Sequence, residues 1–227
     1  MKMTQEQKVK KNDFIEILFT GYANDKPFDS NIEEDLKQIN PEAKPEKIII
    51  ALGQGMLVPG LDNQLEGKEI GREYEIEVPY KEAFGQRDRT LIKTIPLKSF
   101  TEQKVNPQPG MVFTLDNSLV KIIAVSGARV ITDFNNPLAG KDLKYKITIV
   151  RKVTDAKEKS EALLKTFLRI TPEFEVKDEK VVIKGPKIFE GVINMYKDKF
   201  RELIGKELVF EEKKEEKKLE EKLEENK

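Results

Sequence analysis

Residues 142–153 read DLKYKITIVRKV, and this stretch decides how the chain is organised. Its apolar side chains alternate strictly with polar ones, which predicts a strand with one buried face. That face consists of Leu143, Tyr145, Ile147 and Ile149. Residues 72–78, REYEIEV, alternate in the same way and predict a second half-buried strand. We infer that the two strands belong to one domain, although a long segment separates them.

The chain between these strands changes character at residues 87–136. Four short apolar runs, at 90–95, 111–116, 119–125 and 128–134, are separated by turn residues such as Asp116-Asn117 and Ser126-Gly127. The simplest organisation is an insertion of this small β unit into a host domain. The host is interrupted near Gln86 and regains its last strand after Gly140.

The remainder of the host domain is short. Residues 13–20 and 46–52 predict strands, and the first is followed by a turn at Gly21. Residues 33–39 predict a short helix. Pro59-Gly60 starts another helix, which Gly67 ends.

The last quarter of the chain predicts a small α+β domain. Thr154 is expected to cap a helix through Ile170, and a hairpin follows at residues 174–176 and 181–183. Apolar residues three and four apart predict one amphipathic helix at 187–204 and then a closing strand at 208–210. The predicted domains are 1–86 with 137–153, 87–136 and 154–210, followed by a solvated Glu/Lys tail at 211–227.

The composition excludes several kinds of chemistry. The 227 residues include no Cys, His or Trp, so thiol nucleophiles, imidazole bases and Cys or His metal sites are impossible. The 41 Lys and Arg residues balance 41 Asp and Glu residues, which argues against nucleic acid as a partner. Without a signal peptide or a long apolar run, we expect a cytoplasmic protein that does not bind membranes. The Lys-, Glu- and Ile-rich composition hints at a thermophile.

Aromatic and apolar residues stand beside turns at five places in the host domain. They are Phe19-Thr20-Gly21, Phe28-Asp29-Ser30, the LVPGL stretch at 57–61, Ala83-Phe84-Gly85, and Tyr145. In this order and spacing they resemble the FKBP-type peptidyl-prolyl cis–trans isomerases. The resemblance covers about residues 8–86 and 137–152. An insertion directly after Gly85 resembles the insert-in-flap arrangement of SlyD-like members, and the trailing domain looks like that of the long archaeal forms.

The resemblance implies an α+β fold in which an antiparallel half-barrel sheet wraps on a short helix. It implies an isomerase that is also a folding chaperone, with unfolded or proline-containing polypeptides as clients. The catalytic residues would be Asp29, Phe28, Phe84 and Tyr145, with Asp29 orienting the twisted carbonyl region or holding its loop. The substrate-binding residues would be Phe19, Ile48, Leu57, Val58, Leu61 and Leu138. No metal and no cofactor are expected, since the His-rich tail of many SlyD-like proteins is missing.

Three positions depart from the family pattern. Phe19 and Phe84 stand where many members have Tyr, and Leu61 stands where many have Trp. A chaperone of the same fold with an idle isomerase site therefore stays an alternative, as does a scaffold that joins partners through its charged tail. The inserted unit would bind clients or serve only as a bulky flap. The C-terminal domain is a candidate for homodimerisation.

Overall fold

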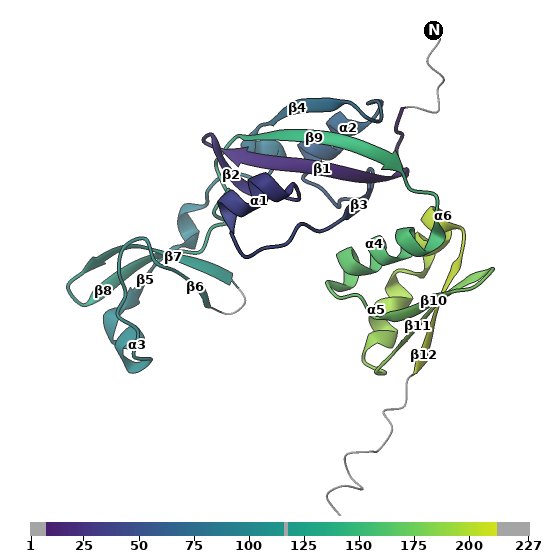
Figure 1. Cartoon of the computed structure of the whole chain (residues 1–227). Helices are drawn as coiled ribbons and strands as arrows, with labels where there is room; N and C mark the ends of the chain where they lie inside the picture. Colours follow the sequence, from purple (N-terminus) through teal and green to yellow (C-terminus); the bar gives the residue numbers. More distant parts are fainter. Residues whose placement is uncertain (1–7, 116–117, 213–227) are drawn as a thin grey trace, which may run out of the picture.

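A computed structural model describes residues 8–115 and 118–212 and arranges them around three separate sheets (Figure 1). Below, the central unit denotes residues 8–86 with 137–153, the inserted module denotes 87–136, and the C-terminal unit denotes 154–212. In the view of Figure 1, the inserted module and the C-terminal unit project from opposite ends of the central sheet toward the same side. The domain boundaries stay predictions.

The central sheet is antiparallel throughout and curls into a half-barrel, as expected from the family resemblance. Its path is β2-β1-β9-β4, and β3 pairs with the other end of β1. The strands are β1 (Phe14–Ala23), β2 (Lys26–Ser30), β3 (Ile48–Ala51), β4 (Glu73–Val78) and β9 (Leu143–Lys152). The four apolar residues predicted on one face of β9 are all at most 5% exposed, so that prediction is confirmed.

Two short helices complete the central unit. Helix α1 (Glu33–Ile39) has the predicted bounds, and α2 (Pro59–Leu65) starts at the predicted proline, whose missing N–H is tolerated at a first turn. Leu61 and Leu65 of α2 are buried in the core under the sheet. The predicted turn at Gly21 is wrong, because β1 continues through it to Ala23 while pairing with both β2 and β9.

The inserted module is a four-stranded sheet with the order β5-β8-β7-β6. Its elements are β5 (Ile92–Pro96), α3 (Leu97–Glu102), β6 (Val112–Leu115), β7 (Ser118–Ser126) and β8 (Arg129–Asp133). The predicted strands are present, whereas α3 was not expected from the sequence. The predicted turn at Asp116-Asn117 lies outside the described residues. The buried core is small: Phe100, Ile122 and Val130 form one cluster, and Val120 is also fully buried.

Polar contacts close the stem where the inserted module leaves and rejoins the central unit. The Gly140 amide donates to the Gly85 carbonyl at 2.8 Å, so the two connecting chains lie side by side. Arg87 forms an ion pair with Asp133 at 2.6 Å. The side chain of Asn135 accepts from the Asp88 amide at 2.8 Å and donates to the Asp88 carbonyl at 2.9 Å.

The C-terminal unit packs three helices against a three-stranded sheet of order β10-β11-β12, in which β12 runs parallel to β11. Its elements are α4 (Ala156–Leu168), β10 (Glu173–Val176), β11 (Lys180–Gly185), α5 (Phe189–Met195), α6 (Lys197–Ile204) and β12 (Glu207–Glu212). The hairpin and the closing strand were predicted. Of the predicted Glu/Lys tail, only Glu211 and Glu212 are described, and they end β12.

Two helix predictions in this unit need correction. Asp155, one residue after the predicted cap, caps α4 by accepting the Glu158 amide at 2.8 Å. The single helix predicted at 187–204 is two helices, interrupted at Tyr196. Packing explains the break, since Phe200 and Leu203 of α6 are buried while Ile188 before α5 is 81% exposed. The two short helices bury Ile193, Phe200 and Leu203 in one cluster and leave Ile188 at the surface.

One apolar cluster joins the C-terminal unit to the central unit. Phe14 of β1, Ala51 of β3 and Val153 after β9 are buried together with residues of α4, β11 and α6. The two units therefore share a core. Among the described helices, none has the length and apolarity needed to cross a membrane.

Candidate active site

Four strands of the central sheet bring one row of residues side by side. Gly21 on β1 lies opposite Asp29 on β2 and opposite Tyr145 on β9, and Tyr145 in turn faces Ile76 on β4. Directly paired residues of antiparallel strands project on the same face of a sheet. The row therefore places Asp29 and Tyr145 on either side of a residue that has no side chain.

Three aromatic rings meet over this gap. Phe28 has no partner on β1, because the register shifts between Gly21 and Tyr22, and such bulges redirect side chains. Its ring meets that of Tyr145 edge to face at 6.0 Å between centroids, and the Phe19 ring lies 6.3 Å from Tyr145. A Cβ on Gly21 would lie 2.6 Å from Phe28 Cζ and 3.0 Å from Tyr145 Cε1. The glycine of the Phe-Thr-Gly motif is thus required by this close approach.

Buried polar groups hold the two motif segments together. The Thr20 and Ser30 hydroxyls are 2.9 Å apart, and Thr20 also donates to the Asp35 carboxylate at 2.5 Å. The Asn31 side chain accepts from the Phe19 amide and donates to the Ile17 carbonyl, both at 2.8 Å. Because hydrogen bonds satisfy these buried groups, the network fixes β2 against β1 and hence Phe28 and Asp29 in place.

Most of the predicted site residues converge on one apolar cluster. Phe19, Leu61 and Tyr145 are buried in the core of the central unit. The partly buried residues packed against that core include Phe28, Ile48, Leu57, Val58 and Leu138. Leu138, which follows the inserted module, thus returns to the cluster formed by residues before it. The individual roles of these residues stay predictions.

Phe84 is separate from this cluster. Its side chain is 36% exposed, in the loop after the 3-10 turn Tyr80–Glu82, and it is not packed against the core of the central unit. The loop itself is ordered by the Gly85 amide, which donates to the Tyr80 carbonyl at 2.7 Å. Phe84 therefore lies at the edge of the central unit, directly before the inserted module.

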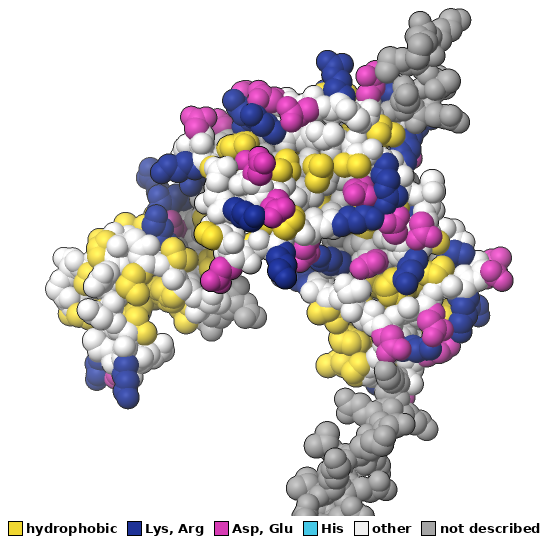
Figure 2. Space-filling model, in the orientation of Figure 1, with side chains coloured by type: hydrophobic (Ala, Val, Ile, Leu, Met, Phe, Trp, Pro, Cys, Tyr) yellow, Lys and Arg dark blue, Asp and Glu magenta, His cyan; other side chains and the backbone are white. Residues whose placement is uncertain are grey.

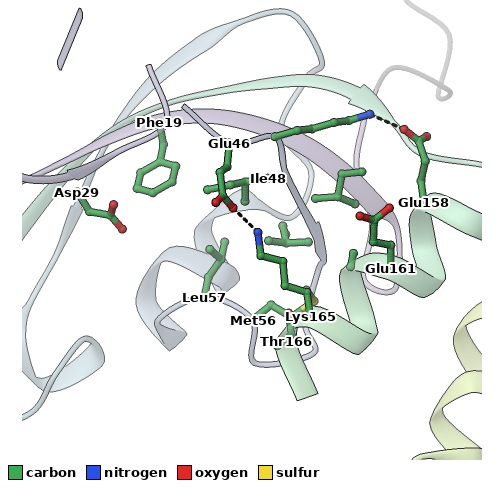
Figure 3. A pocket seen from close by; sticks show the side chains of 14 residues that line it. Phe19, Asp29, Glu46, Ile48, Met56, Leu57, Glu158, Glu161, Lys165 and Thr166 are labelled. Atoms are coloured by element: carbon green, nitrogen blue, oxygen red, sulfur yellow. Dashed lines mark hydrogen bonds and ion pairs between the residues drawn. The ribbon is translucent and has the colours of Figure 1, made fainter. Parts of the chain in front are cut away.

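A cavity of about 490 Å³ opens beside the cluster (Figure 3). Phe19, Asp29, Ile48 and Leu57, all predicted site residues, line one side of it. The residues that sequence reasoning missed are Glu46, Lys47, Ile49, Ile50 and Met56 of the central unit and Glu158, Glu161, Ala162, Lys165 and Thr166 of α4. The α4 residues carry no motif, because their polar side chains follow the ordinary pattern of a helix surface.

Two of the predicted catalytic residues, Asp29 and Tyr145, have shifted pKa values. Although Asp29 is exposed at the cavity rim, desolvation by the surrounding protein raises its pKa, against the opposing effect of the Ser30 backbone amide. Burial, with a smaller contribution from Asp29, raises the pKa of Tyr145 to about 12. Tyr145 therefore keeps its hydroxyl proton at neutral pH. Among the described residues, no three His, Cys, Asp or Glu side chains gather as metal ligands would.

Comparison with known proteins places this geometry in a family. A family model described as FKBP-type peptidyl-prolyl cis-trans isomerase matches residues 5–114. A short-type peptidyl-prolyl cis-trans isomerase from Methanocaldococcus jannaschii is 34% identical over 144 residues, which are 62% of this chain and 92% of that protein. The chain belongs to the FKBP-type peptidyl-prolyl cis-trans isomerase family. The central unit carries the FKBP motifs, and their residues form the cluster described above.

Further similarities concern the insertion. A family model described as FKBP26, IF domain, matches residues 93–138. SlyD, an FKBP-type isomerase of Escherichia coli, is 34% identical over 102 residues, 43% of this chain and 52% of SlyD. SlyD of Treponema pallidum is 34% identical over 109 residues, 45% of this chain and 61% of that protein. The chain thus spans little more than half the length of these SlyD proteins, and the FKBP match extends into an insert-in-flap module.

Proposed function

We propose that this protein is a peptidyl-prolyl cis–trans isomerase whose inserted module binds unfolded polypeptides. The observation that carries the proposal is the convergence of Phe19, Phe28 and Tyr145 from three strands on one apolar cluster. Phe19 and Asp29 also line the cavity beside that cluster. Rotation about an X–Pro bond needs no proton carrier or metal, because the barrier of ~18–20 kcal/mol arises from the double-bond character of the amide. A chain without His or Cys is suited to that reaction.

The site lowers this barrier by binding the twisted amide better than the planar one. An apolar wall replaces water around the bond and disfavours the charge-separated planar form. The prolyl ring packs against Phe28, Tyr145 and Leu61, and the Val58 backbone amide is the proposed donor to a substrate carbonyl. Asp29 and the Tyr145 hydroxyl supply the polar groups that orient the twisted carbonyl.

The test is an isomerisation assay with short proline peptides. The protein is expected to accelerate cis–trans exchange, which without a catalyst takes tens of seconds or longer. Asp29→Leu and Phe28→Ala each lower kcat/KM at least about tenfold, since they remove a polar group and a wall of the site. Lys26→Ala, at an exposed position of the same strand, is the matched control. A parent protein without activity would instead establish the alternative, a chaperone with an idle isomerase site.

Phe84 and Leu61 are the positions that favour this alternative. Phe84 provides no hydroxyl, and Leu61 is smaller than the tryptophan common at its position. Phe84→Tyr and Leu61→Trp therefore distinguish the two functions. Activity that appears only in these variants would support the idle site, whereas activity already present in the parent protein would support the isomerase.

The surface of the inserted module supports client binding. Three apolar side chains on the outer face of β6 and β7 are exposed: Val112 by 55%, Leu119 by 54% and Ile123 by 40%. The residues that follow the first two face inward, since Phe113 packs against the small core and Val120 is fully buried. The three exposed side chains line a groove of about 380 Å³ beside the stem, and Figure 2 shows hydrophobic side chains gathered over the module. An exposed apolar surface of this kind marks a protein interaction site.

Removing the inserted module tests its role. The hydrogen bond between Gly140 and Gly85 holds the two ends of the insertion close together, so residues 87–136 can be replaced by a short linker. Peptide isomerisation is expected to persist, while catalysed refolding of a proline-limited protein collapses. The milder variant Val112→Ser with Leu119→Ser should reproduce the loss. If both variants refold the client as fast as the parent protein does, the module serves only as a bulky flap.

The proposed partners include a second copy of the chain. Ile188 and Met195, before and at the end of α5, are 81% and 78% exposed, and hydrophobic side chains gather over this helix (Figure 2). Light scattering of the whole protein is the test. Ile188→Glu with Met195→Glu should convert a dimer to a monomer, whereas Leu18→Glu on the central sheet, also an exposed apolar position, should not. A parent protein that is monomeric would refute homodimerisation.

A further inference from the structure

The cavity at the isomerase site has two walls that come from different units. One wall consists of Phe19, Ile48 and Leu57 of the central unit, and helix α4 of the C-terminal unit forms the other through Glu161, Lys165 and neighbouring residues. Figure 3 shows α4 across the cavity from Phe19 and Asp29. Phe19 and Leu57 belong both to this wall and to the apolar cluster of Phe28, Tyr145 and Leu61 against which the prolyl ring packs. A substrate whose proline lies on that cluster therefore meets α4 with a neighbouring residue.

The α4 wall is held firmly in position. Leu163 and Leu164 of α4 are buried in the apolar cluster that also contains Phe14 and Ala51 of the central unit. Ion pairs add to this on the polar side, where Arg151 binds both Glu16 and Glu158 at 2.8 Å. Because buried side chains and charges both fix the helix, its cavity face has a defined position relative to the apolar cluster around Tyr145.

The charges on the two walls do not cancel. Lys47 pairs with Glu158 and Glu16, and Lys165 pairs with Glu46 across the middle of the cavity (Figure 3). Both lysines of the cavity are therefore already paired with carboxylates. Glu161 has no ion-pair partner among the described residues, and neither has Asp29 on the opposite side. The uncompensated charge in the cavity is negative.

We infer that α4 selects among substrates of the isomerase, with Glu161 favouring polypeptides that carry a Lys or Arg next to the proline. This inference rests on the proposed function. A cationic side chain in the cavity gains the attraction of Glu161 and Asp29, while an acidic one is repelled. The Glu46–Lys165 pair is exposed and weakly held, so a substrate can displace it at little cost. Glu161 is thus a specificity-determining residue contributed by the C-terminal unit.

The experiment measures kcat/KM of the whole protein for two peptide series. One series varies the residue before the proline and the other the residue after it, each as Lys, Gln or Glu. The Lys peptide is expected to exceed the Glu peptide in at least one series. Glu161→Gln should lower this Lys-to-Glu ratio about threefold, and Glu161→Lys should reverse it, as expected for a partly exposed charge pair. Glu190→Gln removes an exposed carboxylate that does not line the cavity and should leave the ratio unchanged.

Raised salt provides an independent measurement on the unmodified protein. At 1 M salt the screening length falls to about 3 Å, so the preference for Lys should disappear while the Gln peptide is still isomerised. A Lys-to-Glu ratio of one at low salt, or an unchanged ratio in Glu161→Gln, would overturn the inference and leave the isomerase intact. Inactivity toward every peptide would overturn both the inference and the proposed function.

Discussion

The two units attached to the central unit are joined in opposite ways. The inserted module has its own small core and meets the central unit through a polar stem at Arg87, Asp133 and Asn135. The C-terminal unit shares a buried apolar cluster with β1 and β3 and adds ion pairs at its edge. Shared apolar burial couples the stability of two units, whereas a hydrogen-bonded stem leaves each to unfold separately. The polar stem suits the client-binding surface proposed for the inserted module. The shared apolar cluster suits the C-terminal unit, whose helix α4 forms a fixed wall of the cavity.

Phe14→Ala should cause the largest loss of stability and thereby test the coupling between the central and C-terminal units. Phe14 is 2% exposed in the cluster that joins the two units, and removing such a side chain costs about 3–5 kcal/mol. The central and C-terminal units should lose stability together, as a single shifted transition in calorimetry. A transition that splits in two, with only one part shifted, would show that the shared cluster does not couple them.

Phe100→Ala should unfold the inserted module alone. Phe100 belongs to the small buried cluster of the module, with Ile122 and Val130, and contacts Phe113 edge to face at 5.7 Å. The same truncation, about 3–5 kcal/mol, exceeds what so small a core is expected to withstand. Limited proteolysis should then cut within residues 87–136, while peptide isomerisation persists. Loss of peptide isomerisation in this variant would contradict the independence of the module.

Asn135→Ala should loosen the stem without unfolding either neighbour. Asn135 is 7% exposed and bonds both backbone groups of Asp88 in partly buried hydrogen bonds, so its removal leaves these groups unpaired at a cost of about 1 kcal/mol. Hydrogen exchange should accelerate at Asp88 and Gly140, with the core amides of β7 and β9 unchanged. Gln86→Ala, at an exposed position of the same connection, is the control, and equal exchange in both variants would argue against the stem.

Acidification should produce the smallest effect, at the polar edge of the shared interface. Hydrogen bonds from Arg151 and then Lys47 lower the pKa of Glu158 from 4.5 to about 2. A carboxylate whose pKa is lowered by folding stabilises the folded state at any pH above its pKa in the unfolded chain. This contribution is lost as the pH falls from about 4.5 to about 2. Glu158→Gln should reduce the pH dependence of the melting temperature in that window. An identical pH profile would show that the network contributes nothing there.

Several features could be predicted because they are local. The alternation in β9 follows from burial on one face, and α2 begins at Pro59 because proline is favoured at a first turn. The Phe-Thr-Gly and Phe-Asp-Ser motifs located the residues around Tyr145 before any contact was known. Helix α3 was missed because it is only six residues long. Phe84, which its motif assigned to the site, is 36% exposed and lies outside the cluster.

The α4 wall shows why the remainder could not be predicted. Phe14, Ala51 and Val153 read as ordinary strand residues, and nothing in their pattern indicates that they face another unit. Glu161 and Lys165 read as ordinary polar positions of a helix surface. Only the docking of α4 turns them toward the cavity, more than 100 residues away along the chain from Phe28 and Asp29.

The sequence by itself determined the family, the insertion and the set of apolar residues available for a proline site, because motif order, alternation and turn chemistry are properties of short segments. The tertiary structure decided which of these residues meet, and it alone brought a second wall from the C-terminal unit to the cavity. The physical reason is that a cavity forms between surfaces, and the relative position of two surfaces depends on side chains buried between distant segments.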